Sequence, residues 1–333
     1  MKLSGLGEFG IISTLSKIVE ESGCTNRPNR KNLLAGIGDD AAAWRNTGNI
    51  TLATTDCLVE NVHFRTGQTS WRDLGWKALA VNLSDIAAMG GTAEHVLVTI
   101  GLPPSVEVES VIELYRGMLE LGNDFDVSIA GGDTTSSKTI FISLTVTGSS
   151  DKNFLKRSSA KPGDLIAVTG HPGMASAGFK LISEGVGKSE TDAPLRFSFL
   201  RPYPRLVEGR AIRAAGGHTA IDVSDGLIAD LKHICISSMT GACVRTDQIP
   251  VHPTACEAFP DQALDMALSG GEDYELLFSA DAAVIDKVKR KTSTTVTVIG
   301  EMTAGPAGVV KVIDADGNPY QLKKTGWDHF GRT

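Results

Sequence analysis

Six segments at predicted strand or helix ends of the 333-residue chain carry acidic residues beside glycine, serine or threonine. A single aspartate in such a turn is commonly a helix cap or a turn residue. Six of them suggest a shared site, because converging carboxylates repel one another unless a cation neutralises them. The segments are Gly38-Asp39-Asp40, Thr54-Thr55-Asp56, Asn82-Leu83-Ser84-Asp85, Gly131-Gly132-Asp133, Asp222-Val223-Ser224-Asp225-Gly226 and Gly270-Gly271-Glu272-Asp273.

The ligand types in these turns indicate a hard cation. Oxygen ligands without a His/Cys cluster favour Mg²⁺ or Ca²⁺ over zinc. The glycine pairs 131–132 and 270–271 allow backbone N–H groups to approach phosphates closely. The sequence has neither the GxxxxGK[ST] pattern nor the protein-kinase motif set. The pattern therefore favours a nucleotide site outside the two commonest kinase folds.

The composition is that of a globular protein with two domains. The chain exceeds the length at which single cores usually stop growing, and 41% of its residues are hydrophobic. Its net charge of −7, without a Lys/Arg run, argues against nucleic-acid binding. Five scattered cysteines without a CxxC pair favour reduced thiols in a cytoplasm. We expect no signal peptide and no membrane span.

The elements that must position the acidic turns can be predicted from hydrophobic periodicity. Because some predicted strands directly neighbour each other, we expect α+β or mixed α/β domains rather than a doubly wound parallel sheet. A turn at Lys161-Pro162-Gly163-Asp164 places the domain boundary near residues 150–160, and segment 185–197 is either a mobile loop or a linker. Strands are predicted over 50–55, 94–102, 127–130, 139–147, 165–169, 219–223, 274–278 and 296–301, with a turn at 131–133; helices are predicted over 11–21, 73–89, 106–121, 175–184, 205–215 and 226–237.

In this order, the motifs resemble those of the thiamine-monophosphate kinase family, within the aminoimidazole-ribonucleotide synthetase-like superfamily. The resemblance runs from Gly7-Glu8-Phe9 to Gly326-Trp327-Asp328-His329-Phe330. Each motif is weak alone, and the ordered set is specific. Its other members are Gly36–Ala41, Thr54–Asp56, His63-Phe64, Lys77–Asp85, Gly131–Thr134, Ala220–Gly226 and Ser269–Tyr274.

The resemblance implies an enzyme that phosphorylates thiamine monophosphate with ATP and several Mg²⁺ ions, the final step of thiamine diphosphate formation. It implies an N-terminal dimerisation and ATP/Mg-binding domain over 1–150, and a C-terminal α/β domain over 151–333 that closes the cleft. We expect a cytoplasmic homodimer. The acceptor phosphate is already ionised at neutral pH, so we expect direct in-line transfer without a general base or a phosphoenzyme.

The resemblance also implies roles for individual residues. Tyr115 lies on an apolar stripe, which favours a core position, and a lone His63 is more often a surface or capping residue. An aromatic face such as that of Trp327 suits a flat cationic ring. The implied metal ligands are Asp40, Thr54, Thr55, Asp56, Asp85, Asp133, Asp222 and Asp225; the nucleotide contacts are Gly132, Arg157, Ser224 and Tyr115; the thiamine contacts are His63, Glu272 and Trp327.

Two alternatives remain open at this stage. A sister ATP-dependent synthetase, forming a ring or a phosphorus–selenium bond, would share the acidic turns. Cys24 lacks the context of the reactive cysteine expected in the selenium enzyme. A non-catalytic cation-binding protein is the second alternative, although the DxDxDG loops of calcium modules are absent from the sequence.

Overall fold

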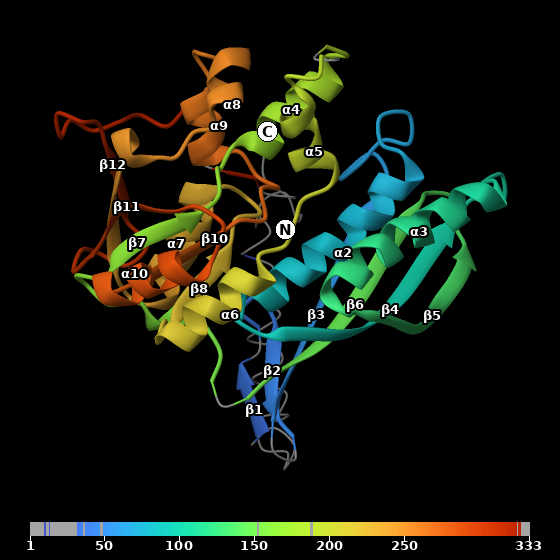
Figure 1. Cartoon of the computed structure of the whole chain (residues 1–333), viewed down its shortest axis with the longest axis horizontal. Coiled ribbons are helices and arrows are strands. Elements are labelled where there is room, and N and C mark those ends of the chain that lie inside the picture. Colours follow the sequence, from blue (N-terminus) through green and yellow to red (C-terminus); the bar gives the residue numbers. More distant parts are fainter. Residues whose placement is uncertain are drawn as a thin grey trace.

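The computed structural model describes residues 10, 13, 32–35, 37–46, 49–151, 153–186, 189–324 and 326–327. The helix predicted over 11–21 falls outside these residues except for Ser13, and so do the Gly7-Glu8-Phe9 motif and the 328–330 end. The described chain forms two six-stranded mixed sheets, each packed against helices (Figure 1). This arrangement confirms the mixed α/β fold class with two domains.

The first sheet has the strand order β1-β2-β3-β6-β4-β5. Neighbouring strands are antiparallel, except that β4 and β5 run parallel. Along β6, Ile142, Leu144 and Val146 are buried while the residues between them are partly exposed, so one face of the sheet is the core face. The strands are β1 Leu33–Ala35, β2 Ala42–Arg45, β3 Ile50–Val59, β4 Thr92–Leu102, β5 Ser128–Ser136 and β6 Phe141–Ser150.

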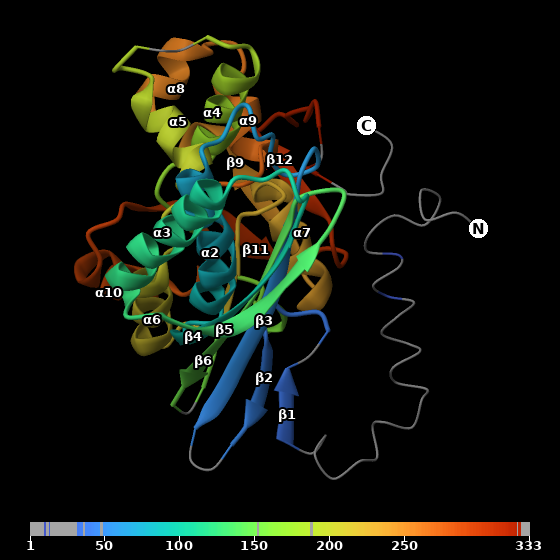
Figure 2. The same cartoon turned by 90° about the vertical axis from the view of Figure 1, so that its right-hand side faces the viewer.

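Helices α2 (Trp71–Ala88) and α3 (Val108–Phe125) cover the core face of this sheet (Figure 2). Helix α2 begins after Ser70, whose hydroxyl accepts a hydrogen bond from the backbone N–H of Asp73. Most of its residues are buried, because the first sheet lies on one side of it and the second domain on the other. Helix α2 therefore packs against both domains.

The second sheet has the strand order β12-β9-β11-β7-β10-β8. Only β12 and β9 are parallel neighbours. Its strands are β7 Leu165–Thr169, β8 Thr219–Asp222, β9 Gly241–Arg245, β10 Leu276–Ala280, β11 Val296–Thr303 and β12 Val310–Ile313. Its helices are α4 Met174–Ser183, α5 Ala193–Leu200, α6 Leu206–Ala215, α7 Leu227–Ser237, α8 Pro253–Ala258, α9 Ala263–Ser269 and α10 Ala282–Lys291.

One apolar core continues from the first domain into the second. It includes Ile86 of α2 and Ile212 of α6, both fully buried. At Gly209 the two helices approach so closely that a Cβ atom would lie 2.0 Å from the carbonyl oxygen of Ala87. This contact fixes α2 against the second domain, and it therefore fixes the acidic turns of both domains relative to one another.

Two of the segments predicted from the sequence have a different structure. Residues 131–133, predicted as a turn, lie inside strand β5. There a Cβ atom on Gly132 would lie 1.8 Å from the carbonyl oxygen of Val98, and φ is +154°. The glycine therefore permits a close approach to β4 rather than a reversal of the chain. The end of segment 185–197 is helical, because α5 begins at Ala193 with Pro194 in its first turn. No described helix has both the length and the apolar character that a membrane crossing would require.

Candidate active site between the two domains

Three carboxylates from three separate segments meet where α2 faces strand β8. Asp40, Asp85 and Asp222 each place an oxygen within 4.8 Å of the others. Asp40 precedes β2, Asp85 lies in the last turn of α2, and Asp222 ends β8. The structure thus brings together acids that are up to 182 residues apart in the chain (222 minus 40), as the sequence pattern predicted.

Residues of strand β3 extend this acid cluster. The Thr54 hydroxyl donates a hydrogen bond to Asp85 Oδ2 at 2.5 Å. The backbone N–H of Asp56 donates to Asn82 Oδ1 at 3.0 Å, which anchors the strand to α2. The carboxyl of Asp85 donates a hydrogen bond to that of Asp56, which opposes the effect of burial on the pKa of Asp56. We use the name acid cluster for Asp40, Asp56, Asp85 and Asp222.

Burial and repulsion favour the protonated form of three carboxyls of the acid cluster, those of Asp85, Asp222 and Asp56. Burial, followed by repulsion from Asp56, Asp222 and Asp40, raises the pKa of Asp85 well above its ordinary value. Burial and the charge of Asp40 raise the pKa of Asp222 to about 8, although Ser84 donates a hydrogen bond of 2.6 Å to its carboxylate. Burial also raises the pKa of Asp56. A divalent cation would relieve this repulsion, and the all-oxygen donor set suits Mg²⁺.

Arg157 supplies the positive charge next to the acid cluster. Its Nη2 and Nε atoms donate to the two carboxylate oxygens of Asp40 at 2.7 and 3.1 Å. Its backbone N–H donates to Asp39 Oδ1 at 2.9 Å. Burial works against the charged guanidinium, but Asp40 outweighs it and the pKa of Arg157 is raised. Arg157 is thus a two-pronged clamp on Asp40 rather than a solvated surface charge.

A second group lies at the turn before α7. Asp225, Asp230 and His233 each place a ligand atom within 4.8 Å of the others. The Asp230 carboxylate accepts hydrogen bonds from the backbone N–H groups of Ser224, Asp225 and Gly226 at 3.1–3.2 Å. Asp230 therefore fixes the turn that carries Ser224 and Asp225. The pKa of His233 is lowered to about 4, mainly by burial.

Glu272 is held by a buried lysine of helix α2. Lys77 Nζ lies 3.1 Å from Glu272 Oε1 and 3.7 Å from the centre of the Phe199 ring. The side chain of Lys77 is 3% exposed, and burial lowers its pKa although Glu272 opposes this shift. Glu272 has φ +66°, and its backbone N–H donates to the Ser224 carbonyl at 2.7 Å. The pair therefore ties α2 to the turn beside the acid cluster.

The remaining predicted residues lie at varied positions. The Thr55 hydroxyl donates to the Leu144 carbonyl within the first sheet rather than to the acid cluster. Asp133 is exposed on β5, and strands β6 and β4 separate it from Asp56. Tyr115 packs against the core from α3. His63 Nδ1 accepts from the Val59 N–H, and the backbone N–H of half-exposed Trp327 donates to the Asp225 carbonyl.

Comparison with known proteins identifies the family. The family models for the N-terminal and C-terminal domains of AIR synthase related proteins match residues 38–150 and 161–313. The thiamine-monophosphate kinase of Salmonella typhimurium is 39% identical, over 97% of this chain and 98% of its own length. The chain belongs to the thiamine-monophosphate kinase family. The thiamine-monophosphate kinase of Bacillus subtilis is 32% identical, over 89% of this chain and 93% of its own length.

Solved structures of this kinase family agree with the fold. The structure "AaThiL complexed with AMPPCP and TMP" has a TM-score of 0.85 at 30% identity, covering 99% of each chain. The thiamine-monophosphate kinase of Stenotrophomonas maltophilia has a TM-score of 0.76 at 34% identity, covering 91% of this chain and 96% of its own. The resemblance inferred from the motifs is therefore confirmed, and the chain is an enzyme of this kinase family.

Sequence reasoning placed several residues within motifs but assigned them no role in the site. Ser84, Asn82 and Lys77 contact the acid cluster or Glu272 from the same helix that carries Asp85. A signal was available, because residues 77 and 85 are eight positions apart and lie on one face of a helix. A lysine on the buried face of an otherwise apolar helix requires an anionic partner. The spacing of residues along the sequence does not identify its partner, Glu272, because the two residues come from different domains.

Proposed function

We propose that this chain transfers the γ-phosphate of ATP to thiamine monophosphate, producing thiamine diphosphate and ADP. The observation that carries the proposal is the convergence of Asp40, Asp85 and Asp222 within 4.8 Å, beside the guanidinium of Arg157. The named activity of full-length relatives supports the acceptor, and the solved relative in complex with AMPPCP and TMP supports the pair of substrates.

The proposed reaction depends on magnesium. Ions held by Asp40, Asp56, Asp85 and Asp222, with Asp225 at the neighbouring turn, would offset the repulsion between the two phosphate chains. The acceptor oxygen is already ionised at neutral pH, since the second pKa of a phosphate monoester is about 6. We therefore propose direct in-line transfer without a phosphoenzyme and without a general base.

The chain's own residues would place the substrates around the acid cluster. Arg157 holds the carboxylate of Asp40 with two hydrogen bonds, and Ser224 lies between Asp222 and Asp225 on the turn held by Asp230. On the thiamine side, Glu272 supplies a carboxylate that Lys77 holds in place. The backbone N–H of Trp327 donates to the Asp225 carbonyl on the same turn, and an indole ring would suit stacking on a thiazolium cation. We propose His63 as a third contact on this side.

We further propose a cytoplasmic homodimer paired through the first sheet. Residues 1–150 would be the dimerisation and nucleotide domain, and residues 151–333 would close the site. Cys57 and Leu97 are exposed on strands of this sheet, which supports an interface there. Within one chain, Gly132, Asp133 and Tyr115 lie away from the acid cluster. Pairing would allow Gly132 and Tyr115 to contact nucleotide, and Asp133 to bind metal, in the paired molecule. Sedimentation should show twice the 35.2 kDa chain mass, and a monomer at all concentrations would contradict pairing.

A coupled assay tests the proposed reaction. Purified protein with ATP and Mg²⁺ should form thiamine diphosphate when thiamine monophosphate is added. Aminoimidazole precursors and selenide should cause no additional ATP use. Turnover with either of those acceptors would favour a sister synthetase, and cation binding without turnover would favour a non-catalytic protein.

A further inference from the structure

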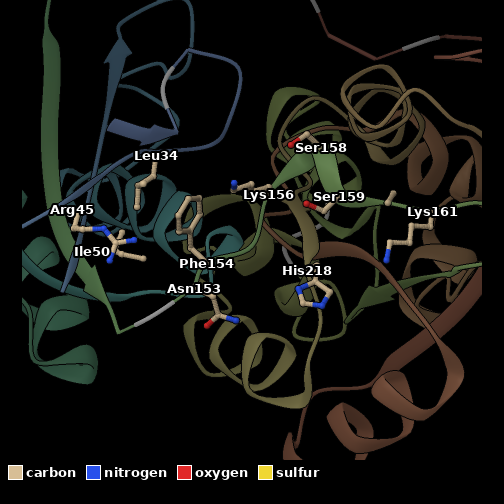
Figure 3. A pocket seen from close by; sticks show the side chains of 11 residues that line it. Leu34, Arg45, Ile50, Asn153, Phe154, Lys156, Ser158, Ser159, Lys161 and His218 are labelled. Carbon is tan, nitrogen blue, oxygen red and sulfur yellow. The ribbon is translucent and has the colours of Figure 1, made fainter. Parts of the chain in front are cut away.

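A cavity of about 670 Å³ lies at the junction of the two domains (Figure 3). Residues 153–161, which connect the first sheet to the second, form much of its wall. Strands β1 to β3 contribute from the first domain, and His218 contributes from the position just before β8. The volume is that of a small-molecule site.

The cavity is positively charged within an acidic protein. Arg45, Lys156 and Lys161 line it, and the chain as a whole carries a net charge of −7. Among the described residues that line it there is no carboxylate. A concave surface with charges of one sign concentrates ligands of the opposite sign.

The two ends of the cavity differ in chemistry. Leu34, Ile50 and Phe154 lie towards the left of Figure 3, together with Arg45. The hydroxyls of Ser158 and Ser159 lie to their right, with Lys161 further right and His218 below the serines. Lys156 is placed between these ends, with its Nζ 4.9 Å from the centre of the Phe154 ring. The arrangement suits a molecule with a flat or apolar part and an anionic group.

The cavity is separate from the acid cluster. None of the four acids lines it. Arg157 directs its guanidinium to Asp40, whereas its neighbours Lys156 and Ser158 line the cavity. The connecting segment therefore presents alternate side chains to two different places.

We propose that this cavity is a second binding site, which takes a small phosphorylated organic compound. The phosphate binds among Lys156, Lys161 and the two serine hydroxyls, and the organic part packs against Leu34, Ile50 and Phe154. Because the occupant contacts the residues on either side of Arg157, its binding acts on the clamp that holds Asp40. The site thus offers a route by which a metabolite regulates the enzyme.

Lysine labelling with pyridoxal 5′-phosphate tests this proposal on the full chain. This phosphorylated aromatic aldehyde forms imines with nearby lysines, and borohydride traps them for peptide mass spectrometry. With EDTA present, Lys156 and Lys161 should be labelled well before Lys289 and Lys291, which are exposed on α10. Inorganic pyrophosphate should protect the first pair only. Uniform labelling, or labelling without protection, would overturn the proposal.

Two variants test whether the cavity and the acid cluster are separate sites. Arg45→Gln removes an exposed cation of the cavity and should weaken protection by pyrophosphate roughly tenfold. Asp85→Asn alters the acid cluster and should leave the labelling of Lys156 unchanged. If Asp85→Asn changes the labelling of Lys156, or weakens its protection by pyrophosphate as much as Arg45→Gln does, the cavity belongs to the reaction site and the second-site proposal is wrong. A failure of the kinase assay alone would leave these binding results intact.

Discussion

The guanidinium of Arg157 donates two hydrogen bonds, of 2.7 and 3.1 Å, to the carboxylate of Asp40. Asp40 belongs to the first domain, and Arg157 lies on the segment that leads to the second. The carboxylate of Asp40 is completely buried, and a buried carboxylate requires a paired cation. The contact therefore links the segment that leads into the second domain to the acid cluster.

Replacing Arg157 should lower the free energy of unfolding. Arg157→Met leaves the Asp40 charge buried without its clamp, and we expect a loss of about 3 kcal/mol in the free energy of unfolding. Arg157→Lys should lose less, because one of the two hydrogen bonds can remain. Urea unfolding measures this effect. The control is Arg245→Met, whose half-exposed pair with Asp247 should contribute less than about 1 kcal/mol. Equal losses in Arg157→Met and the control would contradict the account.

Asp85→Asn should reduce kcat by about 100-fold or more while the protein remains folded. The amide keeps the shape of the side chain but removes the charge that would hold a cation. Because repulsion with Asp56 and Asp222 also disappears, the metal-free variant should melt at the same temperature as the wild type or higher. Steady-state kinetics and thermal melts check both statements. Asp286→Asn, an exposed change on α10, is the matched control and should leave both unchanged.

The stability of the metal-free protein should fall as the pH rises from about 5 to 9. Asp222 has a pKa of about 8 in the folded protein, against an ordinary value of 3.8. The folded state therefore binds more protons than the unfolded chain over this range, and the stabilisation is lost as the pH rises through the folded pKa. Melts in EDTA should show the fall, and added Mg²⁺ should restore several degrees at pH 9. A melting temperature that rises steadily with pH in EDTA would contradict the shift.

The acid cluster could largely be foreseen from the sequence, because acids at the ends of apolar segments tend to gather at one edge of the fold. Asp40, Asp56, Asp85 and Asp222 met as expected. Asp133 did not join them within one chain, since strand order cannot be read from local periodicity and two strands intervene. Likewise, a pair such as Lys77 and Glu272 depends on tertiary packing across both domains.

The glycine pair in strand β5 shows the same limit. Pairs of glycines beside aspartate usually indicate a turn. Here Gly132 instead lets an edge strand approach Val98. Sequence pattern identified the need for glycine but could not distinguish a turn from a close backbone contact.

Gly132→Ala should destabilise the first domain far more than Gly131→Ala. Both glycines have nearly the same φ, +154° and +156°. A Cβ atom on Gly132 would collide with the Val98 carbonyl, whereas one on Gly131 would lie 3.8 Å from its nearest neighbour, Leu97. We expect losses of about 3 kcal/mol and about 1 kcal/mol, respectively. Urea unfolding of the two variants measures the difference, and equal losses would show that β5 is placed differently.

The Lys77–Glu272 pair should show strong coupling in a double-mutant cycle. Glu272→Gln alone leaves a buried ammonium without its carboxylate and should cost about 3 kcal/mol. The double variant Lys77→Met, Glu272→Gln should recover most of this loss, because no buried charge remains. Both variants should raise KM for the acceptor more than KM for ATP. Additive losses in stability, or an unchanged acceptor KM, would remove Glu272 from its proposed role.

The most direct test of the central claim follows the γ-phosphate itself. In a single-turnover reaction with γ-labelled ATP, thiamine monophosphate and Mg²⁺, the label should pass straight into thiamine diphosphate, with no labelled protein at any time. EDTA should abolish the transfer, and Asp222→Asn should slow it severely. Transfer at an undiminished rate in EDTA, or label on the protein before product forms, would contradict an acid cluster that works by holding magnesium between two phosphate chains.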